Sequence, residues 1–409
     1  MSEGNDDSGV AEDNDTGTVD DCGEELPLTP ILDGPTSDKS AGLGVEFETS
    51  QIRFQSEHCS VSDTYDAKGK VVNGRKGKNW KLTADRLDQG LLSAEYILDG
   101  TQIKIGSGTA ETAAKAVAND IASWNPSADM SDTKVSIPDN ACSPWTIVEP
   151  EGGGGTAAMR WVPQITAPMP LQAIYDLFGQ RTAASVLLPS RRNANQNMVT
   201  VTKEFFQSSP SGMSSDDVED DLLGFFSLVM TYTKAADQVD ESGIKALMSI
   251  MPRTDFTTMF KLVKSKVKGD LYDIVKILAC YKGSGSSVEL DTHYCSGSTE
   301  SPKPNGQMDK QTISVVMEAK GTEDSTSVKD WMKSIQDGKS PDRLSEVDQA
   351  RNGQVGGLKG ALENLVHSSQ AAPLFEFRRL KAISTTDMSD FVTKAENAVI
   401  DFHKKYNGK

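Results

Sequence analysis

Two short segments near opposite ends of the chain alternate between apolar and charged side chains. Residues 44–48 read Gly-Val-Glu-Phe-Glu, and residues 374–378 read Leu-Phe-Glu-Phe-Arg. Because successive side chains of a strand point to opposite faces, each segment presents one apolar face and one charged face. An antiparallel sheet with one packed and one solvated face satisfies this pattern. The charged face must meet solvent, a cation or a charged ligand, since burying an unpaired charge is costly.

The amino end has a different composition from the rest of the chain. Before Lys39 the sequence holds 12 acidic residues and no Lys or Arg. Such a stretch cannot bury enough apolar surface to offset its ordering entropy. We therefore expect residues 1–41 to be a disordered acidic leader. Residues 42–409 should form a single folded unit, with loop insertions near 148–158 and 284–310.

Charge and hydropathy exclude several classes of partner. Without the leader, 42 basic residues face 47 acidic ones, so the folded part is only mildly acidic. No Lys/Arg-rich segment with interleaved aromatic residues is apparent, so no nucleic-acid partner is expected. The longest strongly apolar run, Leu222 to Met230, is far too short to span a membrane, and no secretory signal is visible. We expect a soluble cytoplasmic protein, or one part of a larger polypeptide, whose oligomeric state the sequence leaves open.

Cysteine and histidine usage argues against a zinc site and against a Ser/His/Asp triad. The five cysteines include no Cys-x-x-Cys pair and have no histidine at ligand spacing. Reduced, structural thiols are therefore expected. Of the four histidines, His367 and His403 lie on or beside helical segments, where surface or capping roles are expected.

Helix and strand patterns are interspersed along the chain, which predicts a mixed α+β fold. Strands are expected at 44–54, 80–83, 93–98, 102–105, 312–317 and 374–378. Apolar stripes of helical period predict helices at 109–124, 170–178, from about 215 onward, at 271–278 and at 388–402.

Carboxylates and arginines on these elements point to phosphoryl chemistry. Glu95 follows Asp85 by ten residues, in a strand that would place it on a sheet face. With Glu46, Glu48 and Glu376 it offers enough oxygen ligands for one or two hard divalent cations. The planar guanidinium of arginine can donate two parallel hydrogen bonds to a phosphate or a carboxylate. The candidates are Arg253 and Arg378, with Arg160 in a comparable setting.

These motifs resemble the amidoligases, carboxylate-amine ligases related to glutamate-cysteine ligase and glutamine synthetase. The resemblance spans roughly residues 44–406 and implies a curved, largely antiparallel sheet with helices packed on one face. It also implies ATP and Mg²⁺ as cofactors, with an acyl phosphate that an amine attacks. The implied metal ligands are Glu46, Glu48, Glu95 and Glu376, and Arg378 takes a phosphate position. Arg253 is added on its chemistry alone, as a catalytic clamp on phosphate or substrate.

The mid-chain segment departs from the family pattern. Amidoligases commonly carry a Gly-Leu-His-Val-His strand there, whereas this chain reads Val-Pro-Gln-Ile-Thr at residues 162–166. Gln164 is the candidate cofactor-binding residue of that segment. The loss of the histidines leaves a divergent substrate site, an altered metal set and a loss of catalysis as open alternatives.

Two other function classes compete with the ligase. Glu46-x-Glu48 matches the Glu-x-Glu of ADP-ribosyltransferases, with 298–300 resembling their serine-rich strand, but the order of the motifs is reversed. The second rival is a non-catalytic interaction or toxin-associated module that retains the fold. In that case the carboxylates would lie on unrelated faces. In a ligase of small-molecule or peptide carboxylates and amines, they would converge.

Overall fold

The structure is a computed structural model of the whole chain. It describes residues 41–56, 59, 64, 67–88, 91–124, 134–138, 142–148, 156–179, 185–188, 201–203, 205–206, 218–235, 249–284, 287–317, 322–338 and 362–407. Residues 1–40 of the expected leader and the glycine run at 151–155 lie outside these residues, as does the expected helix start near residue 215; Ala41, the last residue of the expected leader, is buried. The division into a leader and a single folded unit stays a prediction.

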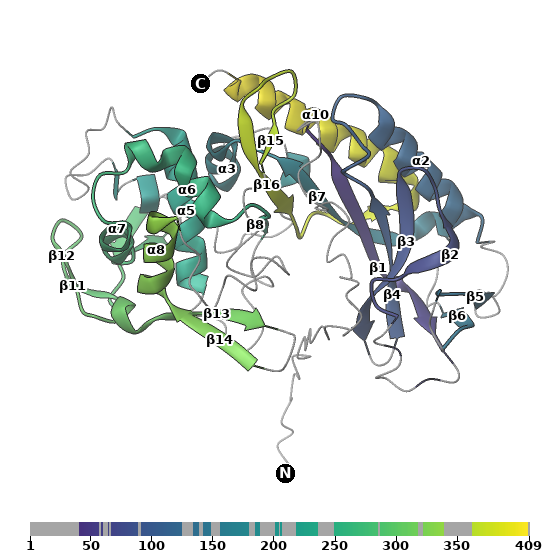
Figure 1. Cartoon of the computed structure of the whole chain (residues 1–409), viewed down its shortest axis with the longest axis horizontal. Helices are drawn as coiled ribbons and strands as arrows, with labels where there is room; N and C mark the ends of the chain where they lie inside the picture. Colours follow the sequence, from purple (N-terminus) through teal and green to yellow (C-terminus); the bar gives the residue numbers. More distant parts are fainter. Residues whose placement is uncertain are drawn as a thin grey trace, which may run out of the picture.

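An antiparallel sheet of 11 strands is the largest sheet among the described residues (Figure 1). Its main path runs β15-β16-β7-β1-β4-β3-β2, so β1 lies at the centre. The strands of this path are β1 (Gly44–Gln55), β2 (Val71–Lys76), β3 (Trp80–Asp88), β4 (Leu91–Leu98), β7 (Arg160–Pro168), β15 (Leu362–Asn364) and β16 (Ala371–Phe377). Four short strands lie off this path: β6 (Trp145–Val148) pairs with β1 and with β5 (Lys134–Val135), β8 (Ile250–Pro252) pairs with β16, and β17 (Ile383–Ser384) pairs with β7.

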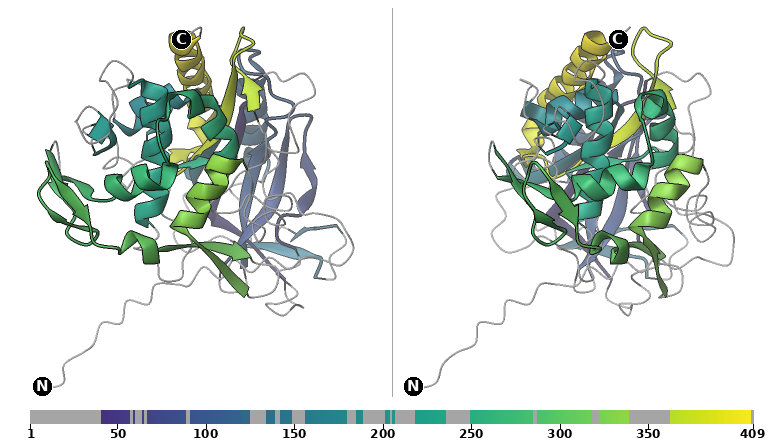
Figure 2. Two further views of the ribbon diagram at one scale, coloured as in Figure 1. Left: turned by 60° about the vertical axis from the view of Figure 1, so that its left-hand side comes forward. Right: turned by 90° about the vertical axis from the view of Figure 1, so that its left-hand side faces the viewer.

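The helices form two groups around the sheet. Figures 1 and 2 show α2 (Thr109–Ala122) and α10 (Met388–Tyr406) side by side on the outer face of the sheet. The second group gathers beyond β8 and β16, away from β2 and β3 (Figure 1). It contains α3 (Leu171–Phe178), α5 (Asp220–Ala235), α6 (Phe256–Val263), α7 (Leu271–Leu278) and α8 (Val328–Asp337). Short 3₁₀ turns occur at Thr156–Ala158, Ser185–Leu187, Lys264–Lys266, Met308–Lys310 and Thr385–Asp387.

Three small hairpins accompany the second helical group. They pair β9 (Tyr281–Ser284) with β10 (Ser287–Leu290), β11 (Cys295–Gly297) with β12 (Pro302–Pro304), and β13 (Thr312–Met317) with β14 (Thr322–Ser327). The first two cover most of the segment expected as a loop insertion at 284–310.

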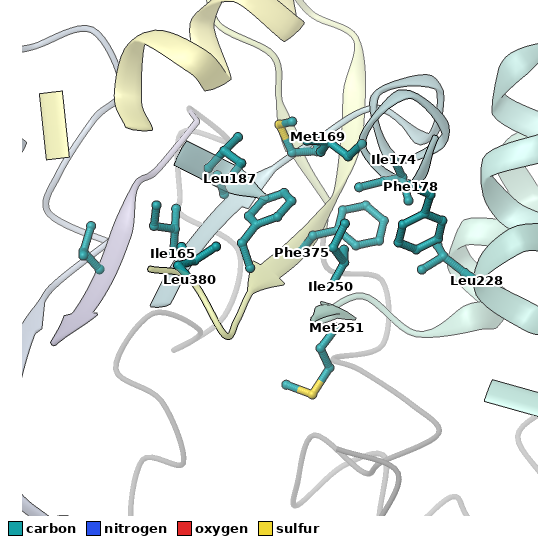
Figure 3. Close-up of a cluster of buried hydrophobic side chains, with 14 of the residues drawn as sticks. Ile165, Met169, Ile174, Phe178, Leu187, Leu228, Ile250, Met251, Phe375 and Leu380 are labelled. Carbon is teal, nitrogen blue, oxygen red and sulfur yellow. The ribbon is translucent and has the colours of Figure 1, made fainter. Parts of the chain in front are cut away.

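One hydrophobic core joins the sheet to both helical groups. The apolar alternation of β1 buries Val45 and Phe47 completely, on the face where Tyr96 also lies. Tyr96 donates to Asp120 of α2 at 2.5 Å, which ties that face to the outer helices. Figure 3 shows the core continuing from Ile165 of β7 and Phe375 of β16 to the side chains of α3. The opposite face of the same strands is left for polar groups.

The structure confirms the predicted mixed α+β class with a large antiparallel sheet. The strand expected at 102–105 is wrong, because these residues form turns with one isolated bridge between Gly42 and Lys104. Periodicity did not predict strand β7, since Pro163 interrupts it, Pro168 ends it and prolines are usually excluded from central strands; only the family resemblance indicated a strand at residues 162–166. It nevertheless lies between β1 and β16.

Four cysteines form disulfides, so the expectation of reduced thiols is wrong for these residues. Cys59 is bonded to Cys142 and Cys280 to Cys295. The first bond joins the segment after β1 to the segment before β6, and these two strands also pair with each other. The sequence offered no signal for either pairing, because both depend on the way the chain folds back on itself.

We expect the first disulfide to stabilise the fold substantially. It closes a separation of 83 residues, and cross-links of this kind typically contribute about 2–4 kcal/mol. The double variant Cys59→Ser/Cys142→Ser should therefore lower the free energy of unfolding, measured by denaturant titration without reductant. Adding dithiothreitol should then shift the variant less than the wild type, because only Cys280–Cys295 remains to be reduced. Equal shifts in both proteins would contradict the pairing.

His403 is buried, which corrects its predicted surface or capping role. Its side chain is 1% exposed, and its Nδ1 accepts from the backbone N–H of Val366 at 3.0 Å. Its Nε2 lies 2.7 Å from the carbonyl of Pro168, so the neutral tautomer donates from Nε2. Burial lowers the pKa of His403 below its ordinary value, outweighing the hydrogen bond to Pro168. The neutral ring thus links α10 to β7.

This ring should make the fold sensitive to acid. Because its pKa is lower in the folded state, its contribution is complete above the unfolded pKa of about 6.5 and is lost as pH falls below that value. The variant His403→Gln can keep both hydrogen bonds without titrating. We expect wild-type stability, followed as the urea midpoint, to fall from pH 7 to pH 5 more steeply than that of the variant. Parallel pH profiles would contradict the buried neutral ring.

No helix among the described residues is long and apolar enough to cross a membrane.

Candidate acidic centre on the polar face of the sheet

Three carboxylates converge on the polar face of the sheet. Glu46 and Glu48 share this face because they are two residues apart in β1, and Glu95 of β4 lies directly opposite Glu48. One carboxylate oxygen from each lies within 4.8 Å of the others. Like charges placed directly opposite across a strand pair are destabilising. The cluster therefore needs protons or a cation to be stable.

Burial raises the pKa of two of these carboxyls. Glu46 is 4% exposed, and its pKa rises to about 8 through desolvation and the charges of Glu376 and Glu48. The pKa of Glu95 is raised well above its ordinary value by burial and then by Asp85, Glu46 and Glu48. Thr83 of β3 donates to Glu95 Oε2 at 3.0 Å and partly offsets this shift. Both carboxyls therefore keep their protons to a higher pH than exposed carboxyls do.

Strand β7 adds polar side chains to the same face of the sheet. Gln164 lies opposite Glu46, and its amide nitrogen donates to Glu48. Thr166 lies opposite Gly44 on one side and opposite Glu376 of β16 on the other. Among the described residues, Glu46 Oε1, Gln164 Oε1 and Thr166 Oγ1 are buried oxygens without a hydrogen-bond partner. Orphaned buried oxygens are costly, and a bound cation or hydrogen-bond donor would satisfy them.

Two arginines form ion pairs with Glu376, which lies beyond β7 on strand β16. Arg378 Nη1 donates to Glu376 Oε1 at 3.0 Å, and Arg253 Nε lies 3.2 Å from Glu376 Oε2. The second contact has the distance of an ion pair without the angles of a hydrogen bond. Arg253 and Glu376 are 3% and 2% exposed, so the charges of this pair are buried.

The backbone of β16 holds Arg253 in place. The N–H of Arg253 donates to the carbonyl of Leu374 at 2.8 Å, and the N–H of Leu374 donates to Thr254 Oγ1 at 2.7 Å. Asp255 then caps α6 by accepting from the N–H of Thr258 at 2.9 Å. These contacts hold Arg253 opposite Leu374, which lies two residues before Glu376 in β16.

Electrostatic coupling links the arginines to the carboxylate cluster. Burial alone would lower the pKa of Arg378, but Glu376, Glu48 and Glu46 outweigh it and hold its pKa above the ordinary value. Tyr232 of α5 responds to the same groups. Burial raises its pKa, and the charges of Arg253 and Glu376 act on it in opposite directions. The second helical group therefore contributes a phenol to the surroundings of this centre.

The structure brings together most of the residues predicted from sequence. Glu46, Glu48 and Glu95 form the one cluster of potential metal ligands found among the described residues. Glu376 lies beyond β7 and is bound by arginines rather than included in that cluster. Sequence reasoning missed Thr83, Thr166 and Tyr232. For Thr83 and Thr166, strand alternation offered a signal, since each lies two residues from another polar residue of its strand; Tyr232 is 1% exposed inside an apolar helix stripe and gave none.

No family model matches the chain, and no curated protein matches it. One solved structure is similar: the ACD domain of a VgrG toxin from Vibrio cholerae, a mutant in complex with ADP and manganese. The match covers 86% of this chain and 96% of that one, with 13% identity and a TM-score of 0.36. At this distance the similarity assigns neither an activity nor a ligand to this chain.

Proposed function

We propose that this chain is an ATP- and magnesium-dependent ligase that joins a carboxylate to an amine through an acyl phosphate. The observation that carries the proposal is the convergence of Glu46, Glu48 and Glu95 on one sheet face, where the charges of Arg253 and Arg378 act on Glu46. A non-catalytic module would not require its carboxylates to lie close together. Their convergence despite mutual repulsion therefore favours a site that binds cations and phosphates.

The donor set fits a hard divalent cation. The three carboxylates supply oxygen ligands of the kind that Mg²⁺ and Mn²⁺ prefer. The unpartnered oxygens of Gln164 and Thr166 lie in the same row and extend the oxygen lining toward Glu376, where a second cation would find ligands. A cation bound there would polarise a phosphoryl oxygen and neutralise charge that develops during transfer.

The remaining residues would orient and stabilise anionic groups. Arg378 and Arg253 would hold phosphate oxygens, and Glu376 would keep both guanidinium groups in one orientation. A substrate carboxylate oxygen would then attack the γ-phosphorus of ATP, releasing ADP. The amine would attack the acyl carbon, releasing phosphate and a proton. Because these groups are buried, their electrostatic effect on the transferred phosphoryl group would be stronger than in water.

Calorimetric titration tests this proposal. We expect the wild type to bind ATP only with Mg²⁺ or Mn²⁺, and we expect Glu48→Gln and Glu95→Gln to weaken that binding by at least about tenfold, or 1.4 kcal/mol. Glu289→Gln, at an exposed position of strand β10, is the matched control and should bind as the wild type does. Arg378→Gln should weaken ATP binding while leaving binding of the metal alone unchanged.

Metal-independent binding of ATP, or binding that survives both cluster substitutions, would remove this role from the carboxylates. If the wild type binds neither metal nor ATP, the non-catalytic alternative is favoured instead. ADP release upon adding amines and carboxylates is the follow-up assay for the ligase reaction itself.

The disulfides bear on where such an enzyme would operate. Disulfides persist in oxidising compartments and are rare in the cytosol. The two bonds, one at the end of β1 and one between α7 and β11, therefore favour folding outside the reducing cytoplasm over the cytoplasmic location expected from the sequence.

A further inference from the structure

A pair of lysines lies on the polar face of the sheet, on the other side of the carboxylate cluster from the arginines. Lys76 of β2 and Lys81 of β3 are directly opposite each other in the ladder. Thr83, two residues after Lys81, points to Glu95, so Lys81 shares the face of the carboxylates. Arg75 pairs with Asp120 on the helix-covered face, which places its neighbour Lys76 on the polar face as well.

These lysines lie on the same line of paired residues across the sheet as Glu46 of the acidic centre. Across the sheet the register runs from Lys76 to Lys81, then to Ile97, Glu46 and Gln164. Adjacent strands are roughly 4.8 Å apart, so the backbone of Lys81 lies about 10 Å from that of Glu46 and Lys76 about 14 Å. A lysine carries its ammonium on a flexible four-carbon stem. Either side chain can therefore lean toward a ligand that extends from the carboxylate cluster.

The arrangement of the pair itself calls for an anion. Like charges directly opposite on neighbouring strands are destabilising. Among the described residues, no ion pair involves either Lys76 or Lys81, whereas Arg75 beside them is paired with Asp120 at 2.9 Å. Two uncompensated ammonium groups at one position of a sheet edge become favourable when an anionic group lies between them.

We propose that Lys76 and Lys81 form an anion subsite that holds a phosphate or carboxylate group of a ligand bound at the acidic centre. This inference rests on the proposed function, because a ligase must collect two anions, a nucleotide and a carboxylate, on a face lined by carboxylates. Arg253 and Arg378 serve one flank of the centre, and the lysine pair serves the other. The shared chemistry is an oxyanion; its source is either the polyphosphate or the substrate carboxylate.

Three probes separate the two sources: ATP with Mg²⁺, tripolyphosphate with EDTA, and the dicarboxylate glutarate. The variants are Lys76→Gln, Lys81→Gln and the double substitution. Lys78→Gln is the matched control, since Lys78 belongs to the same hairpin but lies in its turn. We expect the double variant to weaken at least one probe by about tenfold or more, as the loss of charge-assisted hydrogen bonds predicts, while the control binds as the wild type does.

Weakened ATP and tripolyphosphate with unchanged glutarate identifies the polyphosphate as the occupant, and the reverse pattern identifies the carboxylate. Full-strength binding of all three probes by the double variant overturns the subsite alone. Lysine-dependent binding of tripolyphosphate by a protein that does not bind ATP with Mg²⁺ supports the subsite and overturns the proposed function. Binding of no probe by the wild type removes both.

A charge reversal checks the geometry independently of any ligand. Lys76→Glu places a carboxylate opposite Lys81, so the thermal midpoint of the unliganded protein should rise while binding of the affected probe falls. A lower midpoint in Lys76→Glu, with an unchanged midpoint in the control Lys78→Glu, would show that the two lysines do not face each other.

Discussion

Replacing Glu46 with glutamine should stabilise the protein above pH 8 when no metal is present. The pKa of this buried carboxyl rises from 4.5 to about 8, first by desolvation and then by repulsion from Glu376 and Glu48. A raised acid pKa means that the contribution to stability is complete below the unfolded pKa and is lost as pH rises through the folded pKa. Since one pKa unit corresponds to about 1.4 kcal/mol, the loss between pH 4.5 and 8 amounts to a few kcal/mol.

The measurement is the free energy of unfolding in denaturant at pH 5, 7 and 9 with EDTA. We expect wild-type stability to decline over this range more steeply than that of Glu46→Gln, with the variant the more stable protein at pH 9. The control is Glu111→Gln, an exposed carboxylate on α2 whose loss leaves the pH profile of the wild type intact. Equal slopes for wild type and Glu46→Gln would show that Glu46 ionises as freely as an exposed carboxylate.

Adding a divalent cation should reverse the ranking. A cation that binds only the folded protein stabilises it by mass action. Wild type should therefore gain midpoint temperature from Mg²⁺ or Mn²⁺ at pH 8, whereas Glu46→Gln should gain less because it has lost a ligand. A variant that is more stable without metal and less responsive to it would show that Glu46 trades stability for binding.

Strand alternation carried most of what the sequence could predict about the site. The period of two alone placed Glu46 with Glu48 and predicted the apolar side chains behind them, and both features are present. The same rule could not show that Glu95 lies opposite Glu48, because register between strands depends on the intervening turns. Resemblance to a family supplied that connection.

What the sequence could not show depends on contacts between distant segments. Strand β7 carries two prolines, and its own pattern does not predict a central strand. It is central because it pairs with β1 on one side and with β16 on the other. The disulfides and the buried His403 have the same origin, since each joins segments far apart in the chain. Local sequence patterns contain no information about which of these segments meet.

Removing Arg253 should be among the most destabilising single changes in this protein. Its guanidinium and the Glu376 carboxylate are both almost fully buried, and their separation is 3.2 Å. Breaking a buried ion pair by deleting one partner typically costs about 3–5 kcal/mol, because an uncompensated charge remains. Because Arg378 keeps its own contact with Glu376 at 3.0 Å, Arg253→Met should lower the free energy of unfolding at pH 7 by less than that full amount.

The double variant Arg253→Met/Glu376→Leu separates charge from packing. If the cost of Arg253→Met comes from a buried carboxylate that has lost one of its two arginines, removing that carboxylate should restore much of the stability, since Arg378 is 22% exposed and can be hydrated. Denaturant titration of the wild type, both single variants and the double variant forms a double-mutant cycle. A double variant less stable than Arg253→Met would mean that Glu376 supports the fold through other contacts. Recovery would mean that this charge group is kept at a cost to stability, as expected where two arginines are held ready for an anionic ligand.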